Sequence, residues 1–214
     1  MSEGDRPGYE PSAGRARAAT FALAANVALD ALLCVRFGLA LYLDGHGFPD
    51  WFPTAGLDLY DDFWDLEDLA RRLSVFVTAI VFLAWWHRIA RNGIALAATP
   101  PTYTPGSAVG MWFVPLLNLF VPYQLARQIE AASGGKDDPR IAAWWAAYIG
   151  RGVVWGLGSR VLTGSGLPTL LVYYLVATAT TAGAAWLCVR VIRYFERLQR
   201  EAAIGPEALA EIFA

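Results

Sequence analysis

The sequence predicts an all-α membrane protein with four transmembrane helices and one proline-broken re-entrant or interfacial helix. Hydrophobic residues make up 56% of the 214 residues, and the mean hydropathy is +0.38. Several apolar runs reach about 20 residues, the length that a helix needs to cross about 30 Å of hydrocarbon. A further apolar run is interrupted by prolines, which disfavour an unbroken spanning helix.

The apolar runs divide the chain into a membrane domain and two short ends. Spanning helices are predicted from residue 18 to 43, from Leu66 or Leu69 to Ala90, and over residues 141–162 and 168–192. They form a helical membrane domain over residues 18–200, and the first run is too long for a cleaved signal peptide. Residues 1–17 have too little apolar content to order a chain, which predicts a disordered cytoplasmic tail. Residues 201–214 are predicted to be a short C-terminal cytoplasmic segment.

An acidic loop is predicted between the first two spans, at residues 44–68. It contains eight Asp and Glu residues and no Lys or Arg. Aromatic rings prefer headgroup depth and carboxylates prefer water, so the loop should lie against the membrane interface. A solvated loop and a site for a cation or a basic partner both fit this composition, and no spacing in it matches a calcium-binding loop.

The interrupted run, residues 111–130, carries Pro115, Asn118 and Pro122 at spacings of three and four. Each proline removes a backbone donor and clashes with the preceding turn, so a broken helix is expected. Asn118 could satisfy the backbone groups that the prolines free and thereby hold a bent hairpin. The alternative is a solute site beside Asn118, because broken helices in transporters expose half-helix ends to solutes.

The placement of basic residues predicts how the chain threads through the membrane. If the interrupted run dips in and returns, twelve of the 17 basic residues gather on one side, and the positive-inside rule makes that side cytoplasmic. Both termini are then cytoplasmic in a multi-pass protein of the cell membrane. A kinked fifth span is the alternative. The twelve residues are Arg6, Arg15, Arg17, Arg88, Arg91, Arg127, Lys136, Arg140, Arg190, Arg193, Arg197 and Arg200.

The central part of the chain resembles a bacterial multi-pass membrane family known as domain of unknown function 4328. The resemblance covers chiefly residues 82–133, and this chain has Val121 where family members often carry a basic residue. It implies membrane localisation and topology, and no activity. The matching positions, which are structural or binding candidates, are Arg88, Asn92, Pro105, Gly106, Trp112, Phe113, Pro115, Asn118, Leu119, Pro122, Tyr123 and Glu130.

Three polar residues lie inside the predicted spans: Asn26, Asp30 and Arg151. Asp30 and Arg151 lie at similar depths, and an ionised side chain near the bilayer centre needs a partner. We therefore expect Asp30 to contact Arg151, with Asn26 as a further hydrogen-bond donor. The alternative is a proton-relay carboxylate in a wet cavity. In the second span, Trp85 and Trp86 are expected to mark the membrane interface.

The sequence offers no constellation for catalysis or metal binding. The two cysteines lie inside apolar runs and the two histidines lie far apart, so we expect no disulfide, no metal and no cofactor. Asp30 and Glu130 each lack a partner base or nucleophile, so the protein is not expected to be an enzyme. No nucleic-acid partner is expected either.

The predicted function is that of an uncharacterised integral membrane protein acting as a non-enzymatic interaction or sensory module. A small solute transporter or channel component, with its broken helix around Asn118, is the alternative. Expected partners are anionic lipid at the basic inner face and an unknown protein. Gly152 and Gly156 have the small-xxx-small spacing that permits close helix approach, either within the chain or in a homo-oligomer.

The predicted threading is testable by cysteine labelling. Cysteines introduced at Ser107 and Ser133 should both react with an impermeant reagent from the cytoplasmic side, because the interrupted run returns to its starting face. Labelling of residue 133 from the outside would instead establish a fifth span.

Overall fold

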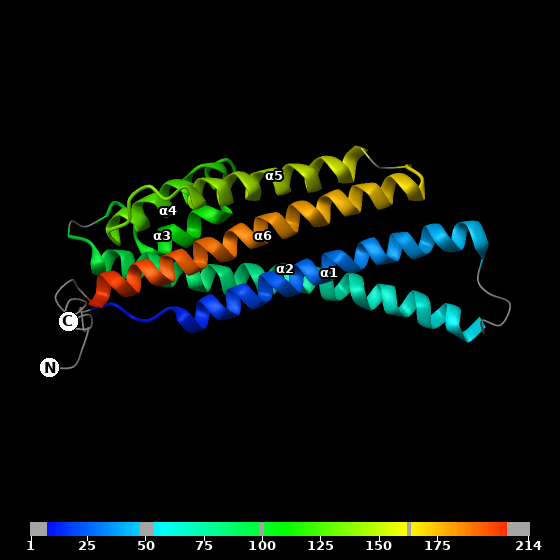
Figure 1. Ribbon diagram of the computed structural model, residues 1–214, viewed down its shortest axis with the longest axis horizontal. Coiled ribbons are helices and arrows are strands. Elements are labelled where there is room, and N and C mark those ends of the chain that lie inside the picture. Colours follow the sequence, from blue (N-terminus) through cyan, green and yellow to red (C-terminus); the bar gives the residue numbers. More distant parts are fainter. Residues whose placement is uncertain (1–7, 48–53, 99–100, 162–163, 205–214) are drawn as a thin grey trace, which may run out of the picture. The chain divides into compact units, whose positions relative to one another are not determined.

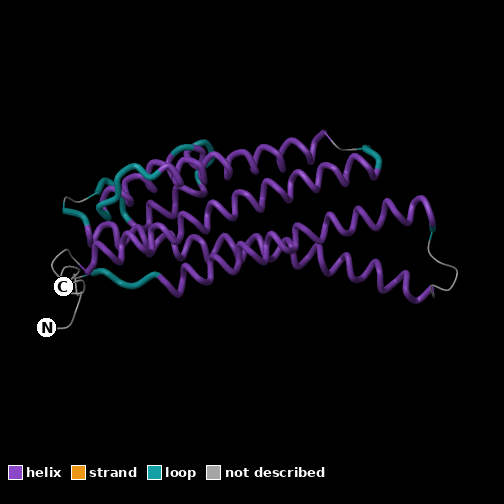
Figure 2. The backbone as a smooth tube through the Cα atoms, in the orientation of Figure 1, coloured by secondary structure: helices purple, strands orange, loops and turns teal. Residues whose placement is uncertain are grey.

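The computed structural model describes residues 8–47, 54–98, 101–161 and 164–204, and these residues form helices joined by short loops, with no strand among them (Figure 2). The prediction of an all-α chain is therefore confirmed. Figure 1 shows the elements in chain order: α1 (Ala13–His46), α2 (Thr54–Leu96), α3 (Pro105–Gly110), the 3-10 helices η1 (Met111–Phe113) and η2 (Leu117–Leu119), α4 (Val121–Ala132), α5 (Pro139–Val161) and α6 (Leu167–Ile204).

Among the described residues, three helices rather than the predicted four are long and apolar enough to cross a membrane. They are α1, the Tyr60–Leu96 part of α2, and α6. The predicted third span corresponds to α5, which has a suitable length of 23 residues but is not among them. Arg151 in the middle of α5 and the four glycines near it lower its hydropathy below that of the other long helices.

Several helix boundaries differ from the predicted ones. α1 begins at Ala13 instead of residue 18, and α6 continues to Ile204, beyond the predicted end at residue 192. The larger correction concerns the acidic loop, because α2 begins at Thr54 and most of the predicted loop is helical. Ion pairs between neighbouring turns favour this helix: Asp68 contacts Arg71 at 2.5 Å and Arg72 at 2.6 Å.

The chain divides into two compact units, and most long helices contribute to both. Unit 1 comprises Met1–Thr20, Ala79–Ala146 and Trp186–Ala214, and unit 2 comprises Phe21–Thr78 and Ala147–Ala185. Unit 1 therefore contains the broken segment and the ends of α2 and α6. Unit 2 contains α1 from Phe21 to its end, the first part of α2, the end of α5 and the start of α6.

Unit 1 is built around an aromatic cluster. Trp85 and Trp86 are fully buried, and Trp86 meets the Trp112 ring at 5.7 Å between centroids. The rings of Trp85 and Trp86 therefore form the core of this unit, and their expected depth at the membrane interface stays a prediction. The members of the aromatic cluster are Phe82, Trp85, Trp86, Trp112, Trp144, Trp145 and Phe195.

Unit 2 joins its helices through small polar groups and leaves an apolar face outside. Asn26 on α1 donates to Ser74 Oγ on α2 at 2.8 Å, and Thr178 on α6 donates to the Asp30 carbonyl at 3.1 Å. On α2, large apolar side chains remain exposed at helical spacing, as expected for a surface that faces lipid. These residues are Leu66, Leu69, Leu73 and Phe76.

Two glycine positions on α5 have opposite surroundings. A Cβ at Gly158 would collide with the Tyr173 ring on α6, whereas a Cβ at Gly152 would meet no atom of the described residues within 4 Å. Close approach of α5 and α6 therefore occurs at Gly158, and among the described residues the predicted intramolecular contact is not made at Gly152.

We predict that Gly158→Ala destabilises the protein and that Gly152→Ala does not. The methyl group at residue 158 forces Tyr173 aside and should cost about 1–3 kcal/mol. At residue 152 the methyl group meets no neighbour, and the higher helix propensity of alanine should leave stability equal or raise it by up to about 1 kcal/mol. Unfolding in mixed detergent micelles measures both variants. Equal destabilisation of the two would contradict the α5–α6 contact.

Candidate functional site

The broken segment begins with a capped helix that uses the predicted Pro-Gly turn. Thr104 Oγ1 accepts a hydrogen bond from the Ser107 backbone at 3.1 Å, and Ser107 Oγ accepts one from the Thr104 backbone at 2.9 Å. Pro105 occupies the first turn of α3, where its missing N–H costs nothing. This reciprocal cap fixes the point at which the chain enters the segment.

A tight turn follows at the first of the two prolines. Leu116 has a φ of 65°, and the Leu117 N–H donates to the Pro115 carbonyl at 2.8 Å, the bond of a γ-turn. The Asn118 N–H then donates to the Val114 carbonyl at 3.0 Å. Positive φ is strained for leucine, so the surrounding structure must hold this turn in place.

The predicted role of Asn118 in satisfying the freed backbone groups is wrong. Among the described residues its side chain makes no hydrogen bond, and its Oδ1 is buried without a partner. The backbone groups near the prolines are instead bonded within the turn itself, where the Leu119 N–H donates to the Leu116 carbonyl and the Phe120 N–H to the Leu117 carbonyl, both at 3.0 Å.

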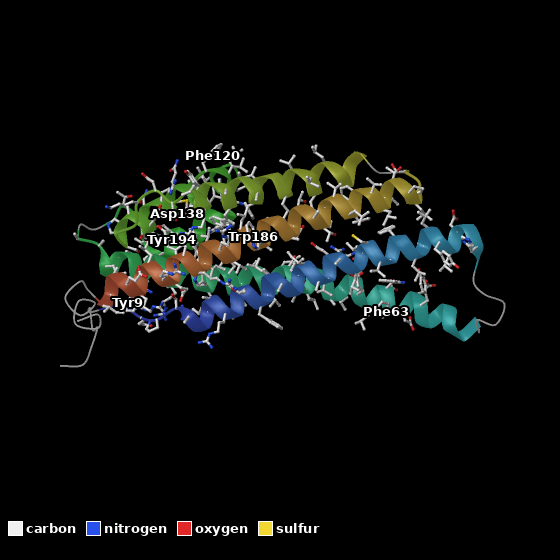
Figure 3. All side chains as sticks on the ribbon, viewed as in Figure 1. Tyr9, Phe63, Phe120, Asp138, Trp186 and Tyr194 are labelled. Atoms are coloured by element: carbon white, nitrogen blue, oxygen red, sulfur yellow. The ribbon has the colours of Figure 1, made fainter. Side chains whose placement is uncertain are left out.

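The turn presents a concentrated set of apolar side chains, and we call residues 113–120 the apolar turn. Phe113 is 71% exposed, Leu116 75% and Phe120 64%. Figure 3 shows Phe120 at the outer edge of the ribbon. Val114, Leu117 and Leu119 are also exposed. Six large apolar side chains on eight consecutive residues make an unusual surface for contact with water.

The base of the apolar turn is anchored in unit 1. η1 contacts both η2 and α4, so the chain reverses direction within the segment. The Trp145 indole donates to the Leu119 carbonyl at 3.2 Å, and Pro122 is fully buried at the start of α4. Trp112, one residue before the turn, lies in the aromatic cluster. The segment is thus held in unit 1 at both ends, by Trp112 before the turn and by Pro122 after it.

Glu130 organises the loop that follows α4. Its side chain is almost fully buried, and Oε1 accepts from the Asp138 N–H at 2.8 Å and from the Tyr194 hydroxyl at 2.7 Å. Oε2 accepts from Arg127 at 2.8 Å, and the Arg127 Nε also donates to the Tyr123 hydroxyl at 3.3 Å. Asp138 and Tyr194 lie close together in Figure 3. This carboxylate is fully occupied by donors and ties α4 to α6.

Asn92 connects the N-terminal segment to the ends of α2 and α6. It is fully buried, its Oδ1 accepts from the Glu10 N–H at 3.2 Å, and its Nδ2 donates to the Glu10 carbonyl at 2.9 Å. The same Nδ2 donates to Gln199 Oε1 at 3.2 Å. Gln199 in turn donates to the Ile89 carbonyl and to Ser133 Oγ, which links this network to the end of α4.

Arg88, the other residue of the predicted exit signature, also binds the N-terminal segment. Its guanidinium contacts the Glu10 carboxylate, and Arg91 reaches the same carboxylate at 3.4 Å. Ser12 donates to Glu196 on α6, which also accepts from the Trp85 indole at 3.3 Å. Arg88 and Asn92 therefore position Glu10 in two ways, through its side chain and through its backbone.

Asp138 and Tyr103 are two of the groups outside the membrane-length helices whose pKa is shifted. The Arg140 guanidinium, which donates to Asp138 Oδ1 at 2.8 Å, holds the pKa of that carboxyl below its ordinary value. Burial raises the pKa of the Tyr103 phenol above its ordinary value. Neither group is placed beside a nucleophile or a second free acid, so both shifts reflect structural roles.

The predicted intramembrane pair Asp30–Arg151 is not formed as a direct contact. Among the described residues the two side chains make no ion pair within 4 Å, and the Arg151 Nε donates to Thr181 Oγ1 at 3.2 Å instead. Asn26 bonds Ser74 rather than Asp30. Asp30 is 3% exposed and its Oδ2 has no hydrogen-bond partner. Thr181 explains why the predicted pair is not formed, because its hydroxyl accepts the hydrogen bond from Arg151.

Several residues of these networks could not be found from the sequence. Glu10 fell in the predicted disordered tail, and Gln199 carries no local signal, being 107 residues from its partner Asn92. Glu67 fell in the predicted acidic loop but is buried. Within the part of the chain that the structure describes, no group of three His, Cys, Asp or Glu residues could hold a metal ion.

The fold places the chain in the class of all-α proteins with helices of membrane-spanning length and hydropathy. A family model described as Domain of unknown function (DUF4328) matches residues 55–197. The chain belongs to this family, which confirms the resemblance seen over residues 82–133 and extends it to both flanking regions. The comparisons with curated proteins and with solved structures gave no match.

We predict that Asn92→Ala detaches the N-terminal segment from unit 1. The substitution leaves the buried Gln199 carbonyl oxygen and the Glu10 backbone without their partner, which should cost about 2–4 kcal/mol. Limited proteolysis near residues 8–12 should accelerate, and unfolding in detergent should shift to milder conditions. Thr102→Ala is the matched control, because it removes an exposed hydrogen bond to Gln128 and should change neither readout. Unchanged protease protection in Asn92→Ala would contradict the anchoring role.

Proposed function

We propose that the protein is a non-enzymatic, multi-pass module of the bacterial cell membrane, in which the apolar turn re-enters the membrane from the cytoplasmic face. On this proposal both termini are cytoplasmic. Unit 1 then forms an inner-face platform that meets anionic lipid and an unidentified protein partner, as expected of an interaction or sensory subunit.

The observation that carries the proposal is the exposure of the apolar turn on an anchored base. A large apolar side chain gains about 1.5–3 kcal/mol when it leaves water, so Phe113, Leu116 and Phe120 together favour insertion strongly. Neither α3 nor α4, with 6 and 12 residues, is long enough to span a bilayer. Because the chain reverses at Leu116, a shallow insertion that returns to the same face fits the geometry.

The distribution of charge between the units supports the orientation. All twelve basic residues that the positive-inside rule assigns to the cytoplasm belong to unit 1, and the other five belong to unit 2. Unit 2 has nine acidic residues against those five. Each exposed Lys or Arg near an anionic surface contributes about 1 kcal/mol of attraction. Unit 1 is therefore the part of the chain suited to the inner leaflet.

A solute transporter or channel component is the second candidate function. One observation favours it: Asn118 Oδ1 is buried at the broken helix without a hydrogen-bond partner, so a solute donor could bind there. Against it, the N–H groups of Leu117 to Phe120 donate to carbonyls of the turn itself and are not free to bind a solute. The membrane-module proposal accounts for more of the exposed surface.

We further propose that α5 of one copy contacts a second copy of the chain in a homo-oligomer. Gly152 and Gly156 lie one helical turn apart on α5, and an added Cβ at Gly152 would meet no atom of the described residues within 4 Å. A second copy could approach closely along this part of α5.

Insertion of the apolar turn is testable by site-directed fluorescence quenching. A fluorophore attached to Phe120→Cys, in a background with Cys34 and Cys188 replaced, should be quenched by lipids that carry a quencher on the acyl chain and protected from iodide. The same label at Lys136→Cys, in the exposed polar loop before α5, should show the reverse. The measurement uses the full chain in vesicles containing anionic lipid.

The outcome that contradicts insertion is equal iodide quenching at residues 120 and 136. A label at residue 120 that is protected from both quenchers would instead place the apolar turn against protein. Sidedness is read from the Lys136→Cys label alone: in inside-out vesicles it should react with an impermeant thiol reagent without detergent.

A further inference from the structure

Unit 2 buries an acidic side chain for which the structure provides no partner. Glu67 on α2 is 4% exposed, and both of its carboxylate oxygens are inaccessible. Among the described residues neither oxygen accepts a hydrogen bond, and Glu67 forms no ion pair within 4 Å. Glu130, equally buried in unit 1, has three donors. An ionised carboxylate cannot be left in this position without a large desolvation cost.

The cations around Glu67 are engaged elsewhere. Arg71, one helical turn further along α2, pairs with Asp68 at 2.5 Å, and Arg36 on α1 lies over the Trp64 ring at 5.6 Å. The Arg71 Nε is nevertheless buried with no hydrogen-bond partner. A donor without an acceptor and a carboxylate without a donor thus stand four residues apart on one helix, a spacing at which side chains meet.

The charged groups that face this site come from three helices. Those acting on Glu67 lie on α2 and α1, and Arg151 on α5 acts on Asp30. α6 contributes the hydroxyl groups of Thr178 and Thr181 beside Asp30. Asp30 itself is buried with one unpartnered oxygen, and a second buried carboxylate disfavours negative charge on Glu67. The groups that act on Glu67 are Arg71, Asp68, Arg36 and Asp30.

We propose that Glu67 is a proton-binding site. It is protonated while Arg71 is paired with Asp68, and it forms an ion pair with Arg71 when the proton dissociates. In this exchange the O–H bond of the carboxylic acid breaks, the proton passes to water, and the resulting carboxylate pairs with the Arg71 guanidinium. Asp68 remains paired, because Arg72 donates to its Oδ2 through two nitrogens at 2.9 and 2.6 Å.

A proton fits this site better than a metal ion. Within the described residues no cluster of three or more His, Cys, Asp or Glu side chains could coordinate a metal. Arg36, Arg71 and Arg151 would repel a bound metal cation. They do not repel a protonated carboxyl group, because it is neutral. The site lies in unit 2, so its test does not depend on how the apolar turn meets the membrane.

The experiment is infrared spectroscopy of the full chain in lipid nanodiscs as a function of pH. A protonated carboxylic acid gives a carbonyl band that is separate from carboxylate bands and shifts in D2O. The wild type should show this band at neutral pH, and Glu67→Gln should lose it. Asp65→Asn, an exposed acidic position on the same turn of α2, is the matched control and should keep the band.

Asp68→Asn is a second variant that tests the proposal even if Glu67→Gln does not fold. Asp68→Asn weakens the hold on Arg71, which becomes more available to the Glu67 carboxylate, so the band should disappear at a lower pH than in the wild type. A band that survives Glu67→Gln, that is lost only in Asp30→Asn, or that is absent from the wild type would overturn the assignment. If the band is half lost at the same pH in Asp68→Asn as in the wild type, the proposed exchange of Arg71 from Asp68 to Glu67 is wrong.

Discussion

The structure of unit 1 depends on the hydrogen bonds of one buried carboxamide. Asn92 pairs with both backbone groups of Glu10 and with the Gln199 side chain, so the N-terminal segment, the end of α2 and the end of α6 are fixed by the same residue. An unpaired buried amide costs about 1–3 kcal/mol, so the hydrogen bonds of Asn92 favour the joint placement of these three elements. The Arg88 contact with the Glu10 carboxylate reinforces the same junction.

Two buried glutamates show how surroundings decide what a carboxylate does. Glu130 receives hydrogen bonds from a backbone N–H, a tyrosine hydroxyl and an arginine, and it serves as a structural link between α4 and α6. Glu67 is as deeply buried but lacks donors, so its charge is not compensated. The first arrangement stabilises an ionised group, and the second favours a bound proton.

The broken segment combines a buried base with an exposed tip. Trp112 and Pro122 are held in unit 1 on either side of the turn, while Phe113, Leu116 and Phe120 point outward. The strained γ-turn at Leu116 bonds part of the backbone to itself, which reduces the number of polar backbone groups left unpaired at an exposed apolar tip. Such a tip suits hydrocarbon, whereas the arginines of unit 1 suit a headgroup layer.

The sequence by itself determined the helical class, the break at Pro115 and Pro122, and the family, because apolar run length and proline chemistry are local properties. Only the tertiary structure decided the partners of the buried polar residues. Asp30 was matched to Arg151 by depth, yet Thr181 takes the arginine donor, and Glu10 looked like part of a disordered tail until Asn92 paired with it. A hydrogen bond is decided within a few tenths of an ångström by residues distant in the chain, and hydropathy and spacing carry no information at that scale.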